Sequence, residues 1–154
     1  MRCYPLPGKG ERFPFVDPSC LPFYVGDITG GRLYPAVMEG VGFAERLAYE
    51  RMQGLGCPVG DVIFTAGGAC RSALWLRIRA SILNRQLKAP RLVDAAMGSA
   101  LLAASASMGG LEAAADAMIG YAATVDPDPA LVGPYGEIYA RFLEDVRRFY
   151  GWEV

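Results

Sequence analysis

The stretch DVIFTAGGACRSALW, Asp61–Trp75, constrains the fold of this chain more than any other. Its apolar start, Val62–Phe64, predicts a buried strand, Gly67-Gly68 predicts a tight turn, and a helix is expected to open near Ser72. Two glycines after a strand let the backbone come close to a ligand, and the free N–H groups of a following helix favour phosphate or a nucleotide edge. The same pattern is also typical of a plain turn between strand and helix, so the residues alone leave both interpretations open.

The chain before this stretch divides into two parts. Residues 1–32 are rich in proline and glycine, which predicts an irregular N-terminal segment with at most a brief strand around Phe13–Val16. Leu33–Leu55 predicts a helix, because apolar residues recur at steps of three and four. The expected buried stripe is Leu33, Val37, Val41, Ala44, Ala48 and Met52. Gly40 and Gly42 inside this helix favour tight packing over contact with a ligand.

The helix after the glycine turn, Ser72–Asn84, also shows a helical period. Its expected buried stripe is Trp75, Ile78 and Ile82. Its arginines, Arg71, Arg77 and Arg79, are expected on a solvated face. Only Arg71, nearest the glycine turn, is a candidate for contact with phosphate or nucleotide.

The remaining segments predict one more strand and three more helices. Gln86–Val93 is the strand, placed near a sheet edge or made irregular by Pro90. Asp94 is expected to cap a helix, and the three helices are Ala95–Met108, Leu111–Ile119 and Val132–Tyr150. The order coil, α, β, α, β, α, α, α predicts an α/β layered domain. Two strands are too few for a stable sheet, so we expect further strands before residue 1.

Composition narrows the function classes. The 154 residues suffice for one domain with a hydrophobic core. The formal net charge is −1 and there is no run of basic residues, which excludes a nucleic-acid binder. For the same reason, electrostatic binding to an anionic membrane surface is not expected. No apolar stretch is long enough to span a bilayer, and the N-terminus has no signal-peptide core. Histidine is absent, which excludes a histidine base and argues against a zinc site. The four scattered cysteines, Cys3, Cys20, Cys57 and Cys70, predict free thiols in a cytoplasmic protein.

Five segments in order resemble one known family. GERFPFVDP resembles G-E-R-x-P-x-x-D-P, LYPAVMEGVGF resembles L-x-R-A-x-x-E-G-x-A-F, and TAGGACRSALWLRIRASIL resembles G-G-G-A-x-S-x-x-W-x-Q-x-x-A-D-x-L. DAAMGSALLAA and the closing PDP…Y…Y segment complete the series. From about Glu11 to Tyr150 the chain thus resembles the C-terminal domain of FGGY-family carbohydrate kinases, which are related to actin, hexokinase and the heat-shock chaperone ATPases.

The resemblance implies a fold and a set of contacts. The fold is RNase-H-like, an actin-like ATPase C-terminal domain truncated at its N-terminal strands, and residues 1–154 are then one partial nucleotide-binding domain. Gly67, Gly68 and Ala69 would contact the adenosine of ATP through their backbone, and Ser72 would hydrogen-bond the adenine. The general base of the family is an Asp of an N-terminal domain, so the resemblance places no catalytic residue in this chain. Mg²⁺ would bridge the phosphates, with no metal ligand expected in these residues.

Two functions follow as expectations. The first is the ATP-binding part of a carbohydrate kinase, which binds ATP or ADP and meets its sugar through a separate N-terminal half. The second is a non-catalytic remnant that serves as an interaction or homodimerisation module through its open sheet edge. Ala66, Arg77 and Ser81 stand where the family usually has Gly, Gln and Asp, which favours the second function. The glycine pair and Ser72 favour the first. The patterns for dinucleotide-binding and P-loop sites are absent.

Overall fold

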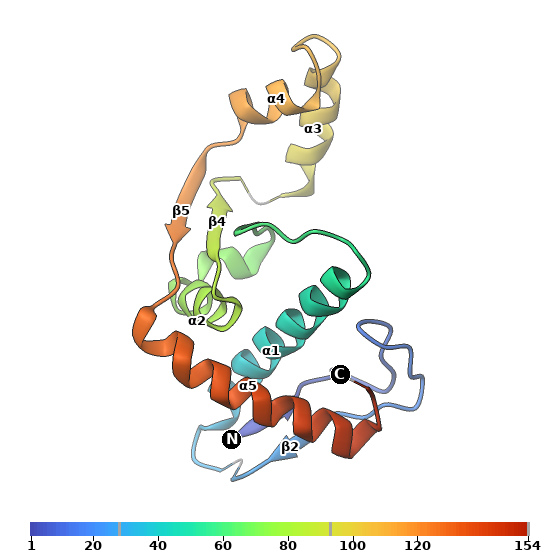
Figure 1. Cartoon of the computed structure of the whole chain (residues 1–154). Helices are drawn as coiled ribbons and strands as arrows, with labels where there is room; N and C mark the ends of the chain where they lie inside the picture. The colour runs from blue at the N-terminus through green and yellow to red at the C-terminus, as the bar shows by residue number, and fades with distance from the viewer. Residues whose placement is uncertain (28, 93, 154) are drawn as a thin grey trace.

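The computed structural model describes residues 1–27, 29–92 and 94–153. Figure 1 shows the helices and strands along the chain. The strands are β1 (Arg2–Tyr4), β2 (Phe23–Val25), β3 (Val62–Phe64), β4 (Gln86–Pro90) and β5 (Tyr121–Val125). The helices are α1 (Leu33–Gly54), α2 (Ala73–Leu83), α3 (Ala95–Ser105), α4 (Leu111–Met118) and α5 (Pro129–Tyr150), with a 3₁₀ turn at Gly68–Arg71. No helix in the described part of the chain is long and apolar enough to cross a membrane.

The central sheet has the order β3-β4-β5. β3 runs parallel to β4, with Ile63 opposite Leu87, and β5 runs antiparallel to β4. The sequence predicted β3 and β4 but missed β5, and the prediction that Pro90 places its strand at an edge is wrong because β4 is central. The predicted irregularity is confirmed by a register shift between Ala89 and Pro90. Val93, the last residue of the predicted strand, lies outside the described residues.

Residues 1–32 are more ordered than predicted, although Ile28 lies outside the described residues. β1 and β2 pair antiparallel, with Cys3 opposite Tyr24. The expected strand at Phe13–Val16 does not form, and that loop is closed instead by a single bridge between Glu11 and Asp17. The two short strands form because Cys3, Tyr4 and Phe23 are buried in the core, a long-range effect that a three-residue apolar run does not reveal.

Helix α1 has the predicted bounds to within one residue, but a different face is buried. The predicted stripe is wrong, since Leu33 and Val41 are exposed, and the buried residues are Ala36, Gly40, Gly42, Phe43 and Leu47. The two glycines explain the choice of face. A Cβ on Gly40 would lie 2.5 Å from the carbonyl oxygen of Cys3, and a Cβ on Gly42 would lie 2.7 Å from Cδ1 of Ile82. The prediction that these glycines serve packing is confirmed.

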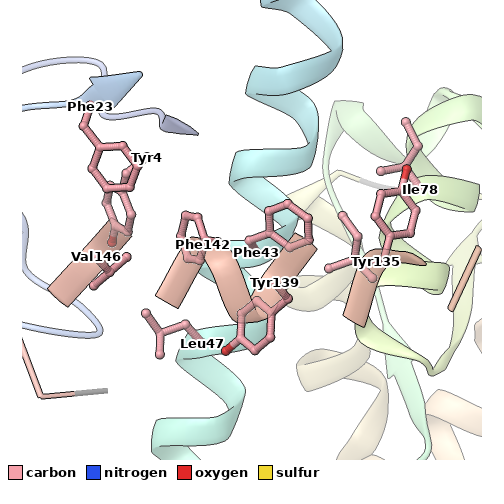
Figure 2. Packing of buried hydrophobic residues seen from close by; sticks show 10 residues of the cluster. Tyr4, Phe23, Phe43, Leu47, Ile78, Tyr135, Tyr139, Phe142 and Val146 are labelled. Atoms are coloured by element: carbon pink, nitrogen blue, oxygen red, sulfur yellow. The ribbon is translucent and has the colours of Figure 1, made fainter. Parts of the chain in front are cut away.

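The main core lies where α1, α2, α5 and the β1–β2 hairpin meet. Figure 2 shows its aromatic residues, with Phe43 of α1 beside Phe142 and Tyr139 of α5. Tyr4 of β1 stacks on Phe142 at 6.0 Å between ring centroids. α5 begins at Pro129, three residues before the predicted start, because the Asp128 carboxylate accepts the N–H of Ala130 as a cap. Cys3, Cys20, Cys57 and Cys70 are all free thiols in the structure.

Helices α3 and α4 form a separate hairpin beyond the ends of β4 and β5 (Figure 1). Asp94 occupies the predicted cap position of α3, but its side chain makes no capping hydrogen bond. α3 ends at Ser105, three residues before the prediction, and α4 matches its prediction to within one residue. None of the eleven residues of α3 is buried.

Candidate functional site

The turn between β3 and α2 has the predicted form. Gly67 adopts a φ of +84°, which side-chain-bearing residues rarely do, and it reverses the chain into the 3₁₀ turn Gly68–Arg71. Ser72 then caps α2, since its Oγ accepts the N–H of Trp75 at 3.2 Å. The predicted strand, turn and helix start at Ser72 are therefore confirmed, and the free N–H groups of the first helical turn lie next to the glycines.

The glycine pair leaves its outer surface open. No atom of the described residues lies within 4 Å of the place where a Cβ would stand on Gly67 or Gly68, and both residues are exposed. Gly40 and Gly42 differ, because the protein itself fills the space that their missing side chains leave. The glycine pair thus exposes backbone that a molecule from outside can approach closely.

An apolar groove of about 340 Å³ runs beside this turn. The turn and α2 contribute Ala69, Ser72 and Trp75, and α1 contributes the opposite wall, made of Tyr34, Val37, Met38 and Val41. This wall was not predicted from the sequence, because Val37 and Val41 were expected in the core. The sequence does contain a signal for this wall: α1 has two apolar stripes, and only one of them can face the core.

A larger cavity of about 670 Å³ borders the residues that lead into the turn. Thr65 and Ala66 form its border with the turn, and the ends of β3, β4 and β5 and the base of the α3–α4 hairpin form the rest. Its charged residues are Arg91 and Asp94. Arg71 is exposed at the end of the 3₁₀ turn and lines neither of these two cavities, so its phosphate contact stays a prediction.

Arg79 lies beneath the turn, and the prediction that it faces solvent is wrong. Its guanidinium donates two hydrogen bonds to the Glu45 carboxylate of α1 and a third to Oγ1 of Thr65. Oγ1 of Thr65 is also 3.3 Å from Sγ of Cys70. The helical period shows only that Arg79 lies off the predicted apolar stripe, and the approach of α1 supplies the carboxylate that draws it inward.

Two of the departures from the family pattern, Arg77 and Ser81, lie in α2 and connect it to α5. Arg77 donates to the Asp128 carboxylate at 2.6 Å, and this hydrogen bond lowers the pKa of that carboxyl. Oγ of Ser81 donates to the carbonyl oxygen of Arg77 at 2.8 Å and accepts the N–H of Asp128 at 3.1 Å. Both residues therefore support the start of α5 and take no part in the glycine turn.

The described residues offer no metal centre, since no three Asp, Glu or Cys side chains among them lie close enough to share an ion. The turn and the groove beside it offer features for binding a small molecule. Open backbone, a helix start, a serine hydroxyl and an apolar groove together suit a flat base with polar edges attached to an anion.

Solved structures that superpose on this chain include carbohydrate kinases. A xylulose kinase from Rhodospirillum rubrum superposes with a TM-score of 0.74 and 25% identity, over 88% of this chain and 28% of that one. A gluconate kinase from Lactobacillus acidophilus gives a TM-score of 0.82 at 20% identity, over 96% of this chain and 30% of that one, which shows the fold alone. The expected fold class, an α/β RNase-H-like domain of the actin-like ATPase type, is confirmed.

The sequence comparison narrows the class to one family. The model of the FGGY family of carbohydrate kinases, C-terminal domain, matches residues 3–107, and this chain belongs to that family. Xylulose kinase of Bacillus subtilis (strain 168) is 33% identical over 136 residues, which are 84% of this chain and 27% of that protein. The chain thus spans less than a third of these kinases. The match includes the glycine turn, whereas the closing helix that we compared with the family lies outside it.

Proposed function

We propose that this chain is the ATP-binding C-terminal part of a carbohydrate kinase, an enzyme that transfers the γ-phosphate of ATP to a sugar hydroxyl. The observation that supports this most is the open surface of Gly67 and Gly68, beside an apolar groove and at the start of α2. Membership of the FGGY family gives the chemistry to which such a site belongs.

Each predicted site residue has a role in this proposal. The backbone of Gly67, Gly68 and Ala69 contacts the adenosine, and the adenine lies in the groove between the turn and the exposed ring of Tyr34, which is 70% accessible. The oxygen of Ser72 already accepts the N–H of Trp75, so its own hydrogen remains for a ring nitrogen of the base. Arg71 is the candidate for the phosphates, since it is exposed one residue before the helix cap.

The sugar and the catalytic base belong to another part of the kinase in this proposal. The resemblance assigns the base to an Asp of the N-terminal domain, and the relatives named above are more than three times as long as this chain. Mg²⁺ would arrive with the phosphates and be held by them and by that domain, because the described residues form no cluster of ligands for it. We therefore expect the 154 residues alone to bind nucleotide and to phosphorylate no sugar.

The test is calorimetric titration of the chain with ATP and ADP. We expect measurable binding by the wild type and loss of binding in Gly68→Asp, because the carboxylate would occupy the surface assigned to adenosine. The backbone of Gly68 lies outside the left-handed region and a Cβ there meets no described atom, so the variant should fold. Gly8→Asp is the matched control, since it adds the same charge at an exposed glycine with equally open surroundings.

Three results would contradict the proposal. A folded wild type that binds neither nucleotide would favour the interaction module instead, and the next measurement would be its oligomeric state. Equal nucleotide affinity of the wild type and Gly68→Asp would mean that the nucleotide binds somewhere other than this turn. Phosphorylation of a sugar by the purified 154 residues would show that they contain a base after all.

A further inference from the structure

We infer that Arg79, held by Glu45, is a positioning residue that keeps the Thr65–Ser72 turn in its nucleotide-binding conformation. This inference rests on the proposed function, because it concerns the same site. Arg79 touches no part of the open surface itself, since its side chain is only 12% exposed and lies beneath the turn.

The contacts of Arg79 fix its guanidinium in one orientation. Nε and Nη2 each donate to one oxygen of the Glu45 carboxylate, a two-point ion pair between α2 and α1. The Glu45 side chain is 20% exposed, so solvent screens the pair only in part. A planar guanidinium held along one edge presents its remaining nitrogen in a fixed direction, and here Nη1 donates to Oγ1 of Thr65.

Thr65 connects this constraint both to the sheet and to the turn. Its N–H donates to the carbonyl oxygen of Lys88 at 2.9 Å, which fixes the point where the chain leaves the sheet. Its Oγ1 is 3.3 Å from Sγ of Cys70, the buried residue of the 3₁₀ turn. Gly67 and Gly68, on the opposite side of the turn, are exposed. The protein therefore holds the turn on its buried side, through Thr65 and Cys70, and leaves the glycines open to solvent.

The same ion pair connects the two walls of the apolar groove. Glu45 lies one helical turn after Val41, and Val41 belongs to the groove wall that α1 provides. Arg79 lies two turns into α2, whose start forms the other wall. Breaking the pair should loosen both the turn and its spacing from α1, so affinity for nucleotide should fall although no nucleotide contact is removed.

The experiment uses three substitutions and one matched control in the full chain. Arg79→Lys keeps the positive charge but loses the planar guanidinium that bonds Glu45 and Thr65 at the same time. Thr65→Val removes the hydroxyl at nearly constant side-chain volume, and Thr65→Ser keeps the hydroxyl. The control is Arg77→Lys, on the same helix, whose ion pair with Asp128 lies away from the turn. For each, the Kd for ADP and the amide exchange rates of Cys70, Ser72 and Ile82 are measured. The first two amides report on the turn, and Ile82, fully buried in α2, reports on global stability.

We expect the Kd for ADP to rise about tenfold in Arg79→Lys and Thr65→Val, with exchange of the Cys70 and Ser72 amides faster by a similar factor. Thr65→Ser and Arg77→Lys should remain within about twofold of the wild type. Unchanged Kd and exchange in both Arg79→Lys and Thr65→Val would overturn the inference. An equal rise in exchange at Ile82 would also overturn it, because the role would then be stability alone.

The two readouts separate this inference from the proposed function. If the wild type binds no ADP, the proposed function fails, and the exchange rates still decide whether Arg79 orders the turn. If the wild type binds ADP and the exchange of the turn does not respond to Arg79→Lys, the proposed function stands and the positioning role fails.

Discussion

The aromatic core and the α3–α4 hairpin are both rich in apolar residues, yet they bury them to very different extents. In the core, Tyr4, Phe43 and Phe142 are each at most 2% exposed, and three helices and a strand pair surround them. In the hairpin, Leu102 is 65% exposed and Ala114 is the only fully buried residue of its two helices. Figure 1 shows the α3–α4 hairpin away from the other helices, and Figure 2 shows the aromatic side chains of the core packed together.

The difference shows that apolar content alone does not make a core. Alanine is the commonest residue of α3, and its side chain removes little area from water, whereas a buried phenylalanine contributes about 2–3 kcal/mol. The core also brings together segments from both ends of the chain, such as β1 and α5. The N- and C-terminal parts therefore depend on each other for stability, and the hairpin between them does not contribute comparably.

The largest test of this contrast compares two truncations to alanine. Phe142→Ala should lower the free energy of unfolding by about 3–5 kcal/mol, because it empties the centre of the core. Leu102→Ala should change it by less than about 0.5 kcal/mol, because that side chain is already in water. Denaturant titration of both variants measures the two values. A similar loss in both would mean that the hairpin belongs to the same cooperative core.

A second, smaller effect uses a matched pair of helical glycines. Gly40→Ala should cost about 1–3 kcal/mol, because the added Cβ would overlap the backbone of Cys3 and push β1 away from α1. Gly98→Ala, in α3, should stabilise by about 0.5–1 kcal/mol, since nothing described lies within 4 Å and alanine favours helix. Thermal unfolding distinguishes the signs. A destabilised Gly98→Ala would show that α3 is more closely packed than its exposure indicates.

A third effect is confined to alkaline pH and tests how deeply Cys3 is buried in the core. Burial, with a further contribution from Glu39, raises the pKa of the Cys3 thiol from 9.0 to about 11. A folded-state pKa above the unfolded one stabilises the fold below about pH 9, and this contribution is lost as the pH rises to about 11. Wild type should therefore lose more stability than Cys3→Ala between pH 8.5 and 11. Buried tyrosines titrate in both proteins, so the comparison isolates the thiol, and equal losses would contradict its burial.

Much of the fold was predictable where local chemistry decides it. β3, β4 and all five helices were predicted, because helical periods, capping residues and glycine turns act over a few neighbouring residues. Three strands were not predicted as such. β1 and β2 are three residues long and form against α1 and α5, and β5 exists because β4 offers it an open edge.

In the candidate site, too, features set by neighbouring residues were predicted, and features set by distant residues were not. The turn at Gly67-Gly68 and the cap at Ser72 were predicted from sequence and have the expected geometry, and their contact with nucleotide stays a prediction. The groove wall on α1 was missed, since Tyr34, Val37 and Val41 are apolar residues at helical spacing and nothing local says which side faces the core. The position of Arg79 was predicted wrongly for the same reason, because its partner Glu45 is 34 residues away.

The sequence by itself determined the strand, turn and helix at 62–83 and the family to which the chain belongs, because these depend on residue types at short, fixed spacings. Only the tertiary structure decided which stripe of α1 is buried. Two apolar stripes competed for the core, and close contact of Gly40 with Cys3 and of Gly42 with Ile82 selected one of them. That selection left the other stripe facing the turn, and so it made a groove from residues that helical periodicity alone had assigned to the interior.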